Sequence, residues 1–209
     1  MSLIDISRSL RPGTAVWPGD TEFEITKLMK IEQGDSVNLT SFRMSSHTGS
    51  HVDAPIHFEM EGLSISDIDL APFWGKAQVV TVGKHSGPLN LQDFAGYDLS
   101  LAPRLLVRSS ASTLDQSIFP SKFVYPSPEF AGKLGKMGII LYGTDGPSVD
   151  AQDSKTLEGH KALYRNGISI LEWLDLSQAA DGLYELAALQ LKVTGADGSP
   201  VRAALRPLR

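Results

Sequence analysis

The sequence contains no cysteine among its 209 residues. No disulfide can form, and neither a thiolate nucleophile nor a cysteine-based structural zinc site is available. Any metal ion must therefore be held by histidine nitrogens and carboxylate oxygens.

The sequence also lacks a block of positive charge and any long apolar run. Lys and Arg number 19 against 24 Asp and Glu, so the net charge is −5, which excludes a general nucleic-acid binder and a polybasic membrane anchor. Apolar runs such as residues 138–142 are far shorter than the roughly 20 residues needed to cross a bilayer. Near the N-terminus, Asp5 lies where a signal peptide would need a basic region. We therefore expect a cytoplasmic protein with no nucleic-acid or membrane partner.

What is present is an ordinary globular composition, with 42% hydrophobic and 21% charged residues. Apolar segments that alternate or are rich in branched residues predict strands at residues 3–7, 23–29, 37–44, 78–82, 104–107, 138–142, 184–193 and 201–205. The last two flank Gly195-Ala196-Asp197-Gly198, which indicates a hairpin turn. Cap and stop signals predict helices at 128–135 and 158–165, ended by Gly135 and by Asn166-Gly167, and a short helical turn at 91–95. We predict an α+β fold, a single domain over residues 1–209 with a mixed sheet or open barrel and flanking helices.

Histidines cluster in one short segment. Three of the five, His47, His51 and His57, fall within eleven residues, and Asp53 lies among them. Three imidazoles and a carboxylate suit Zn²⁺, Mn²⁺ or Fe²⁺ where no thiolate is present. Such groups repel or compete for protons when they lie close together, unless a cation organises them. We therefore interpret the segment as metal-binding, whereas His85 is expected to be a solvated loop residue.

Geometry restricts how this segment can fold around an ion. In one straight strand, ten steps of about 3.3 Å would put His57 roughly 33 Å from His47. A continuous helix is excluded because Pro55 would break it. A bend at Gly49 would bring His47 and His51 together, and a short extended piece would then present His51 and Asp53 on one face.

Residues 47–57, HTGSHVDAPIH, resemble the signature H-x-G-[TS]-H-x-D-x-P-x-H of the metal-dependent cyclase-like hydrolases. Within that family the chain is most similar to the bacterial kynurenine formamidases (arylformamidases). The further matches are VWPGDT at 16–21, D-x-PSVD at 145–150, SKTL at 154–157, His160, ILE at 170–172 and VRA-x-LR at 201–206. They extend over nearly the whole chain. The resemblance implies a swivelling β/β/α fold and hydrolysis of N-formyl-L-kynurenine, an aromatic formamide, to L-kynurenine and formate.

The resemblance also implies a site with two metal ions per subunit, most simply Zn²⁺. His47 and His51 would bind one ion and His160 the other, while Asp53 and Glu172 would bridge both. From the residues alone, His160 is more typical of an exposed helix position, and Glu172 of the surface-facing edge of a strand. The resemblance further implies a homo-oligomer, a dimer or tetramer.

The remaining two functional residues are assigned from the chemistry that the reaction needs. His57, just beyond the ligands, is expected to be the catalytic proton shuttle. Trp17 is expected to form a wall for the substrate's aromatic ring, although it would also be typical of a tryptophan packed over a turn.

Two positions depart from the family pattern, and two other functions remain open. Gly146 stands where a threonine often precedes the proline, and Trp173 follows Glu172 where a small residue is common, which is expected to reshape the substrate pocket. The first alternative is an isatin hydrolase-like enzyme or another cyclic amide or lactone hydrolase of the family. The second is a non-catalytic metal-binding module, which a closed shell of protein ligands would favour.

Overall fold

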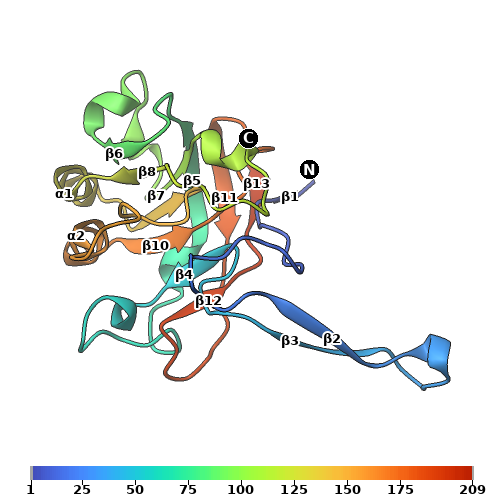
Figure 1. Ribbon diagram of the computed structural model, residues 1–209. Coiled ribbons are helices and arrows are strands. Elements are labelled where there is room, and N and C mark those ends of the chain that lie inside the picture. Colours follow the sequence, from blue (N-terminus) through green and yellow to red (C-terminus); the bar gives the residue numbers. More distant parts are fainter. Residues whose placement is uncertain (1, 209) are drawn as a thin grey trace.

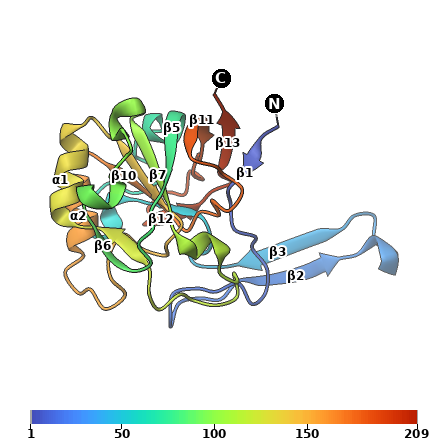
Figure 2. The same ribbon diagram turned by 90° about the horizontal axis from the view of Figure 1, so that it is seen from above.

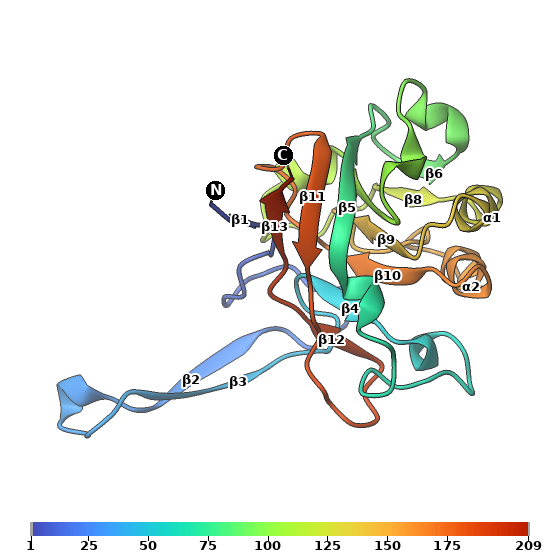
Figure 3. The same ribbon diagram turned by 180° about the vertical axis from the view of Figure 1, so that it is seen from behind.

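The computed structural model describes residues 2–208, and its centre is one nine-stranded mixed sheet (Figure 1). The strand order is β1-β13-β11-β5-β7-β9-β10-β4-β12. The bounds are β1 Ile4–Asp5, β4 His51–Asp53, β5 Trp74–Thr81, β7 Arg104–Arg108, β9 Leu141–Thr144, β10 Ser169–Glu172, β11 Gly182–Ala187, β12 Gly198–Pro200 and β13 Ala204–Pro207. The strand direction turns strongly across the sheet, from upright β5, β11 and β13 to nearly level β10 and β4 (Figure 3), so the sheet curls into a half-barrel. The predicted α+β class with an open barrel is confirmed.

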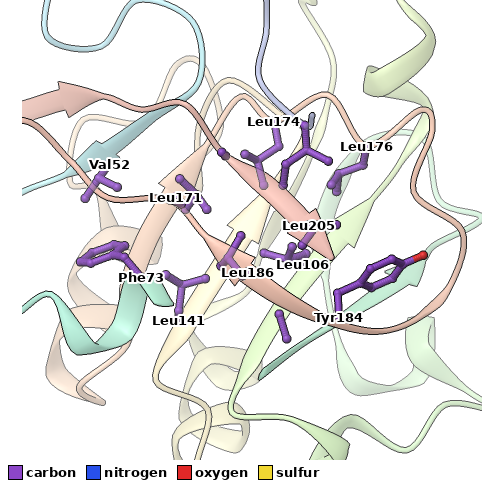
Figure 4. Close-up of a cluster of buried hydrophobic side chains, with 14 of the residues drawn as sticks. Val52, Phe73, Leu106, Leu141, Leu171, Leu174, Leu176, Tyr184, Leu186 and Leu205 are labelled. Atoms are coloured by element: carbon purple, nitrogen blue, oxygen red, sulfur yellow. The ribbon is translucent and has the colours of Figure 1, made fainter. Parts of the chain in front are cut away.

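Both faces of the central strands are buried, and neighbouring residues point to opposite faces. Leu106, Leu141 and Leu171 belong to the core inside the half-barrel (Figure 4), whereas Leu105 and Tyr142 belong to the core beneath the helices. This division follows from the two-residue period of a strand. Parallel pairing of β5, β7, β9 and β10 accounts for their short, continuously apolar sequences.

Two helices lie side by side against one face of the sheet, α1 Pro128–Lys136 and α2 Glu158–Arg165 (Figure 1). The Ser127 side chain accepts a hydrogen bond from the Phe130 amide, as its position at a helix N-cap predicts. The bounds of α2 agree with the prediction, and Gly167 follows it with φ 69°. The predicted turn at 91–95 is a short 3₁₀ helix, Leu91–Phe94, with a capping box. None of the helices in the described part of the chain is long and apolar enough to span a membrane.

The remaining strands form two small sheets. Strands β6 Gly87–Leu89 and β8 Val124–Pro126 pair in parallel near the helices. Strands β2 Glu24–Met29 and β3 Leu39–Arg43 form an antiparallel arm that projects far from the body (Figure 2). The other 3₁₀ turns are Ile31–Gln33, Pro55–His57, Ala71–Phe73, Leu99–Leu101 and Ser110–Thr113.

Two predictions based on glycines, a helix end and a hairpin turn, had different outcomes. Gly135 does not end α1 but lies within it, close against Asn166 of the neighbouring helix end, and the chain turns at Gly138 with φ 81°. The predicted hairpin is present: β11 and β13 pair antiparallel, and the bridge between Gln190 and Val201 continues the same register towards the predicted turn. The tip of the hairpin is longer than a tight turn, however, and it adds β12 beside β4 at the other end of the sheet.

The start of α2 packs so closely on the preceding loop that position 159 requires glycine. A Cβ at Gly159 would lie 2.1 Å from the Val149 carbonyl oxygen, whereas a Cβ at Gly132 of α1 would meet nothing within 4 Å. We expect Gly159→Ala to lower the free energy of unfolding by about 1–3 kcal/mol, because the backbone must move. Gly132→Ala, the matched control, should raise the free energy of unfolding by up to about 1 kcal/mol, because alanine favours a helix more than glycine does. Urea denaturation of both variants measures this, and equal effects would contradict the close approach.

Candidate metal centre

Strand pairing brings three of the predicted ligands to one face of the sheet. His51 and Asp53 are alternate residues of β4, so they share a face, while Val52 between them enters the core. The antiparallel register of β10 with β4 pairs Glu172 with His51. His51 Nε2 consequently lies 3.4 Å from Glu172 Oε2 and 3.3 Å from Asp53 Oδ1, and all three side chains are buried.

His160 reaches the same point from α2. The left-handed turn after this helix returns the chain into β10, as the sequence predicts, so His160 and Glu172 meet although twelve positions separate them. His160 Nε2 lies 3.3 Å from Asp53 Oδ2 and 3.7 Å from Glu172 Oε1. Its other ring nitrogen, Nδ1, donates to Asp150 Oδ2 at 2.7 Å, which fixes the ring and leaves Nε2 directed at the carboxylates.

The bend predicted at Gly49 is present. Gly49 has φ 69°, and the rings of His47 and His51 lie 5.0 Å apart edge to face. His51 Nδ1 donates to the Gly49 carbonyl at 2.8 Å, so its Nε2 is likewise the nitrogen left for a ligand. His47 Nδ1 lies 3.0 Å from Asp53 Oδ1.

The donor set fits a pair of divalent cations. Two groups have ligand atoms that all lie within 4.8 Å of one another: His47, His51 and Asp53, and Asp53, His160 and Glu172. Asp53 belongs to both, and its buried Oδ2 makes no hydrogen bond within the described structure. A buried carboxylate oxygen without a donor is costly unless a cation meets it. Nitrogen and oxygen donors of this kind suit Zn²⁺, Mn²⁺ or Fe²⁺.

Carboxylates also set the protonation of the imidazoles. Burial alone would lower their pKa, but the neighbouring carboxylates outweigh it and raise the pKa of His47 to about 9 and that of His51 and His160 to about 10. The partners are Asp197 and Asp53 for His47, Asp53 and Glu172 for His51, and Asp150 and Asp53 for His160. Burial opposes the ionisation of Asp53, yet the imidazoles hold its pKa well below the usual range.

The cluster forms one end of a cavity of about 320 Å³. Its walls are formed by residues from five parts of the chain: Trp17, Asp20, His47, His51, His57, Pro147, Ser148, Leu157, His160, Glu172 and Trp173. Trp17 packs edge to face on Phe119, with ring centroids 5.3 Å apart, and Phe119 packs in the same way on Trp173 at 5.9 Å. The site is therefore open to a ligand rather than enclosed by protein donors.

Trp173, one of the two departures from the family pattern, has an unusual backbone. Its φ is 56°, rare for a bulky side chain, and hydrogen bonds hold it there: its amide donates to Gly146 O at 2.9 Å, and Ser50 Oγ donates to its carbonyl at 2.7 Å. The Arg8 guanidinium lies 5.3 Å from the indole centroid. Its large ring thus forms part of the cavity wall beside Glu172, where the departure was expected to change the pocket.

His57 also lines the cavity, but its environment differs from that of the other three imidazoles. It follows β4 in a 3₁₀ turn, its side chain is 33% exposed, and burial lowers its pKa. Its ring lies 4.2 Å from that of His47 and 6.0 Å from that of His160. His85 is exposed, as predicted.

Asp197 is a site residue that the sequence analysis missed. Its Oδ2 lies 3.1 Å from His47 Nε2 and 3.3 Å from His57 Nδ1, and its Oδ1 accepts from Ser46 Oγ at 2.8 Å. These three residues, His47, His57 and Asp197, form a third group with donor atoms within 4.8 Å. An aspartate between glycines is the usual signal of a turn, and no spacing connects it to histidines far earlier in the chain.

Comparisons with known proteins establish the family of this chain. The model of the cyclase family, described as "Putative cyclase", matches residues 4–151. The chain is 44% identical to a curated kynurenine formamidase of Salinibacter ruber, over 99% of this chain and 98% of that protein. The chain belongs to the cyclase family and, within it, to the group of the bacterial kynurenine formamidases.

Solved structures share the fold. A structure described as a potential metal-dependent hydrolase with cyclase activity superposes with a TM-score of 0.84 at 23% identity, covering 98% of this chain and 96% of that one. Isatin hydrolase A from Labrenzia aggregata, bound to benzyl benzoate, gives 0.85 at 23% identity, covering 100% and 94%. At these identities the likeness establishes the fold.

The raised pKa values predict how the metal-free protein takes up metal. Protons and cations compete for the same nitrogens, so the three imidazoles must lose their protons on binding. We expect the apparent affinity for Zn²⁺ to keep rising between roughly pH 6 and 9, because these pKa values lie above that of an ordinary histidine. Titration calorimetry in buffers of different ionisation enthalpy measures the released protons. An affinity that stops rising near pH 7.5 would indicate ordinary histidine pKa values of about 6.5 and contradict this.

Proposed function

We propose that this protein is a metal-dependent amidohydrolase that converts N-formyl-L-kynurenine to L-kynurenine and formate. Identity of 40–45% to curated kynurenine formamidases over nearly the whole chain supports the reaction. The observation that carries the proposal is structural: imidazoles and carboxylates of three chain segments, all buried except the half-buried His47, converge on a cavity that an additional histidine and an aromatic wall also line.

The proposed ligands are His47 and His51 for one ion and His160 for the other, with Asp53 and Glu172 shared by both. A divalent cation bound there would lower the pKa of a coordinated water and polarise the formyl oxygen. Zn²⁺ is the ion proposed, at two per subunit, and Mn²⁺ and Fe²⁺ suit the same donors. The Val149 amide donates to Glu172 Oε1 at 2.8 Å, and Asp150 and Gly49 O fix two of the rings, so the donors are oriented before a metal binds.

His57 is proposed to move the proton that the reaction requires. Hydrolysis takes a proton from the attacking water and delivers one to the departing aryl nitrogen. Asp197 lies near His57 Nδ1, so Nε2 is the nitrogen available on the cavity side. The lowered pKa of His57 favours the neutral imidazole, which can accept a proton at neutral pH.

Trp17 is proposed to position the substrate's ring. Its edge-to-face contact with Phe119 fixes the indole, and both Trp17 and Trp173 line the cavity. Rigid aromatic walls bind an aryl group at low entropic cost.

We expect His57→Ala to retain its metal and its stability but to lose about 10²–10⁴-fold in kcat, the usual contribution of general acid–base catalysis. Asp53→Ala is the contrasting variant, because loss of the shared carboxylate should empty both metal positions. Elemental analysis together with a formylkynurenine assay separates these outcomes. Loss of metal from His57→Ala would make that residue a ligand and not a proton carrier.

The same assay decides between the proposed substrate and the alternatives. Isatin, a cyclic amide, is the comparison substrate, and faster turnover of isatin would favour a ring-opening hydrolase. A protein that holds its metal but hydrolyses neither compound would be a non-catalytic binding module. The same assay with a chelator is the control for dependence on the metal.

The projecting arm supports a homo-oligomer, which we propose to be a dimer or a dimer-based tetramer of one single-domain chain. Its apolar side chains face solvent: Ile25, Leu28, Ile31, Val37, Leu39 and Phe42. An isolated two-stranded ribbon with such a surface is marginal in water, and a second copy related by a twofold axis is the commonest way to cover it. The proposed site of action is the cytoplasm.

We expect light scattering to give a mass of at least twice the 22.6 kDa of the chain. Ile25→Asp should shift the protein towards the monomer by burying a charge at the arm's contact. Met60→Asp replaces an equally apolar residue that is 95% exposed away from the arm and should leave the mass unchanged. A monomeric wild-type protein would contradict the proposal.

A further inference from the structure

The cavity contains one charged side chain that the metal centre does not use, the carboxylate of Asp20. Every other ionisable residue of the wall is a histidine or Glu172, and all of these belong to the cluster described above. Among residues 2–208, neither a lysine nor an arginine lines this cavity. A ligand entering it therefore meets an unneutralised negative charge at Asp20.

A tight turn fixes Asp20 beside Trp17. The Asp20 amide donates to Trp17 O at 2.9 Å, and the Thr21 amide donates to Asp20 Oδ1 at 2.6 Å. Within the described residues the exposed Asp20 side chain takes part in no ion pair, and its Oδ2 accepts no hydrogen bond from the protein. The turn needs only one side-chain oxygen, which an asparagine would supply equally well. The local structure therefore does not require the negative charge of Asp20.

A free carboxylate at the wall of a ligand cavity repels anions and attracts cations. A substrate carboxylate is therefore disfavoured near Asp20, whereas a primary ammonium can both neutralise it and donate hydrogen bonds to Oδ2. The indole of Trp17, on the same turn, offers an aromatic face beside that charge. The turn thus presents the two features that would recognise an aryl ring bearing a cationic amino group.

We propose that Asp20 binds the α-ammonium group of the substrate and so selects aryl formamides that carry an amino-acid side chain. This inference rests on the proposed function, because it assumes that an aryl formamide occupies the cavity. It assigns Asp20 to substrate recognition only and gives it no part in the proton transfers.

The test compares Asp20→Asn with the wild-type enzyme on two substrates. One is N-formyl-L-kynurenine, and the other is its deaminated analogue, which keeps the ring, the formamide and the carboxylate but lacks the ammonium. Asparagine preserves an oxygen for the Thr21 amide. We expect kcat/KM to fall about fivefold to tenfold more for formylkynurenine than for the analogue, mainly through KM, as for a partly solvated charge pair. Asp153→Asn, which removes an exposed charge outside the cavity, is the matched control.

Equal losses of kcat/KM on both substrates would indicate a structural role of Asp20 in the turn and overturn the proposal. No loss of kcat/KM on either substrate would also overturn it. Binding of L-kynurenine and its deaminated analogue, measured by calorimetry, repeats the comparison without turnover. Preferential weakening of kynurenine binding in Asp20→Asn supports the assignment even if the wild type hydrolyses formylkynurenine poorly. If the wild type does not hydrolyse formylkynurenine but the binding difference remains, only the proposed reaction is overturned. A wild-type protein that binds neither compound would overturn both the proposed reaction and the role of Asp20.

Discussion

The buried carboxylate of Asp53 is the charge around which the site is organised. An ionised carboxylate removed from water is unstable unless cations or donors surround it. Imidazoles of His47, His51 and His160 lie 3.0, 3.3 and 3.3 Å from its oxygens, and they arrive from a loop, a strand and a helix. One oxygen still makes no hydrogen bond. The surrounding protein therefore stabilises the negative charge of Asp53 only in part, and a bound metal ion would complete the stabilisation.

The mixed sheet is what allows this convergence. Strand β4 lies between β10 and β12, antiparallel to both, so Glu172 pairs with His51 on one side while Asp197 enters from the other. Parallel pairing of β10 with β9 places a helix between them in sequence, and that helix carries His160. A register shift of one residue in β10 would turn Glu172 into the core, where an unpaired carboxylate would be costly. The register and the metal site thus depend on each other.

Local signals predicted the parts of the site that lie close together in sequence. The bends at Gly49 and after α2 were indicated by glycines, which readily adopt a left-handed backbone, and the extended piece through Asp53 by the alternation of its side chains. Glycine was ambiguous because it serves two purposes. Gly198 was interpreted as part of a hairpin turn and does lie in the tip of that hairpin, but a Cβ there would also lie 2.8 Å from the ring of His47, so glycine is needed for close approach. Long-range placement of this kind is decided by strand order, which one sequence does not specify.

The cavity combines a metal-binding cluster, an aromatic wall and a separate carboxylate, that of Asp20. When cations displace the protons of the imidazoles, Asp53 and Glu172 are left to balance the charge of the bound ions, and ions held there would polarise a formyl group. The indoles of Trp17 and Trp173 line the same cavity, and their rings offer a face to an aryl group without charge. Trp173 keeps its position at the cost of a left-handed backbone, and such strain persists only where surrounding contacts over-determine it. The hydrogen bonds to Gly146 and Ser50 supply that constraint. In this chain the large residue beside Glu172 therefore forms part of the cavity wall, while Glu172 still lies 3.4 Å from His51 Nε2. The departure is thus expected to act on the shape of the substrate pocket and not on the metal ligands.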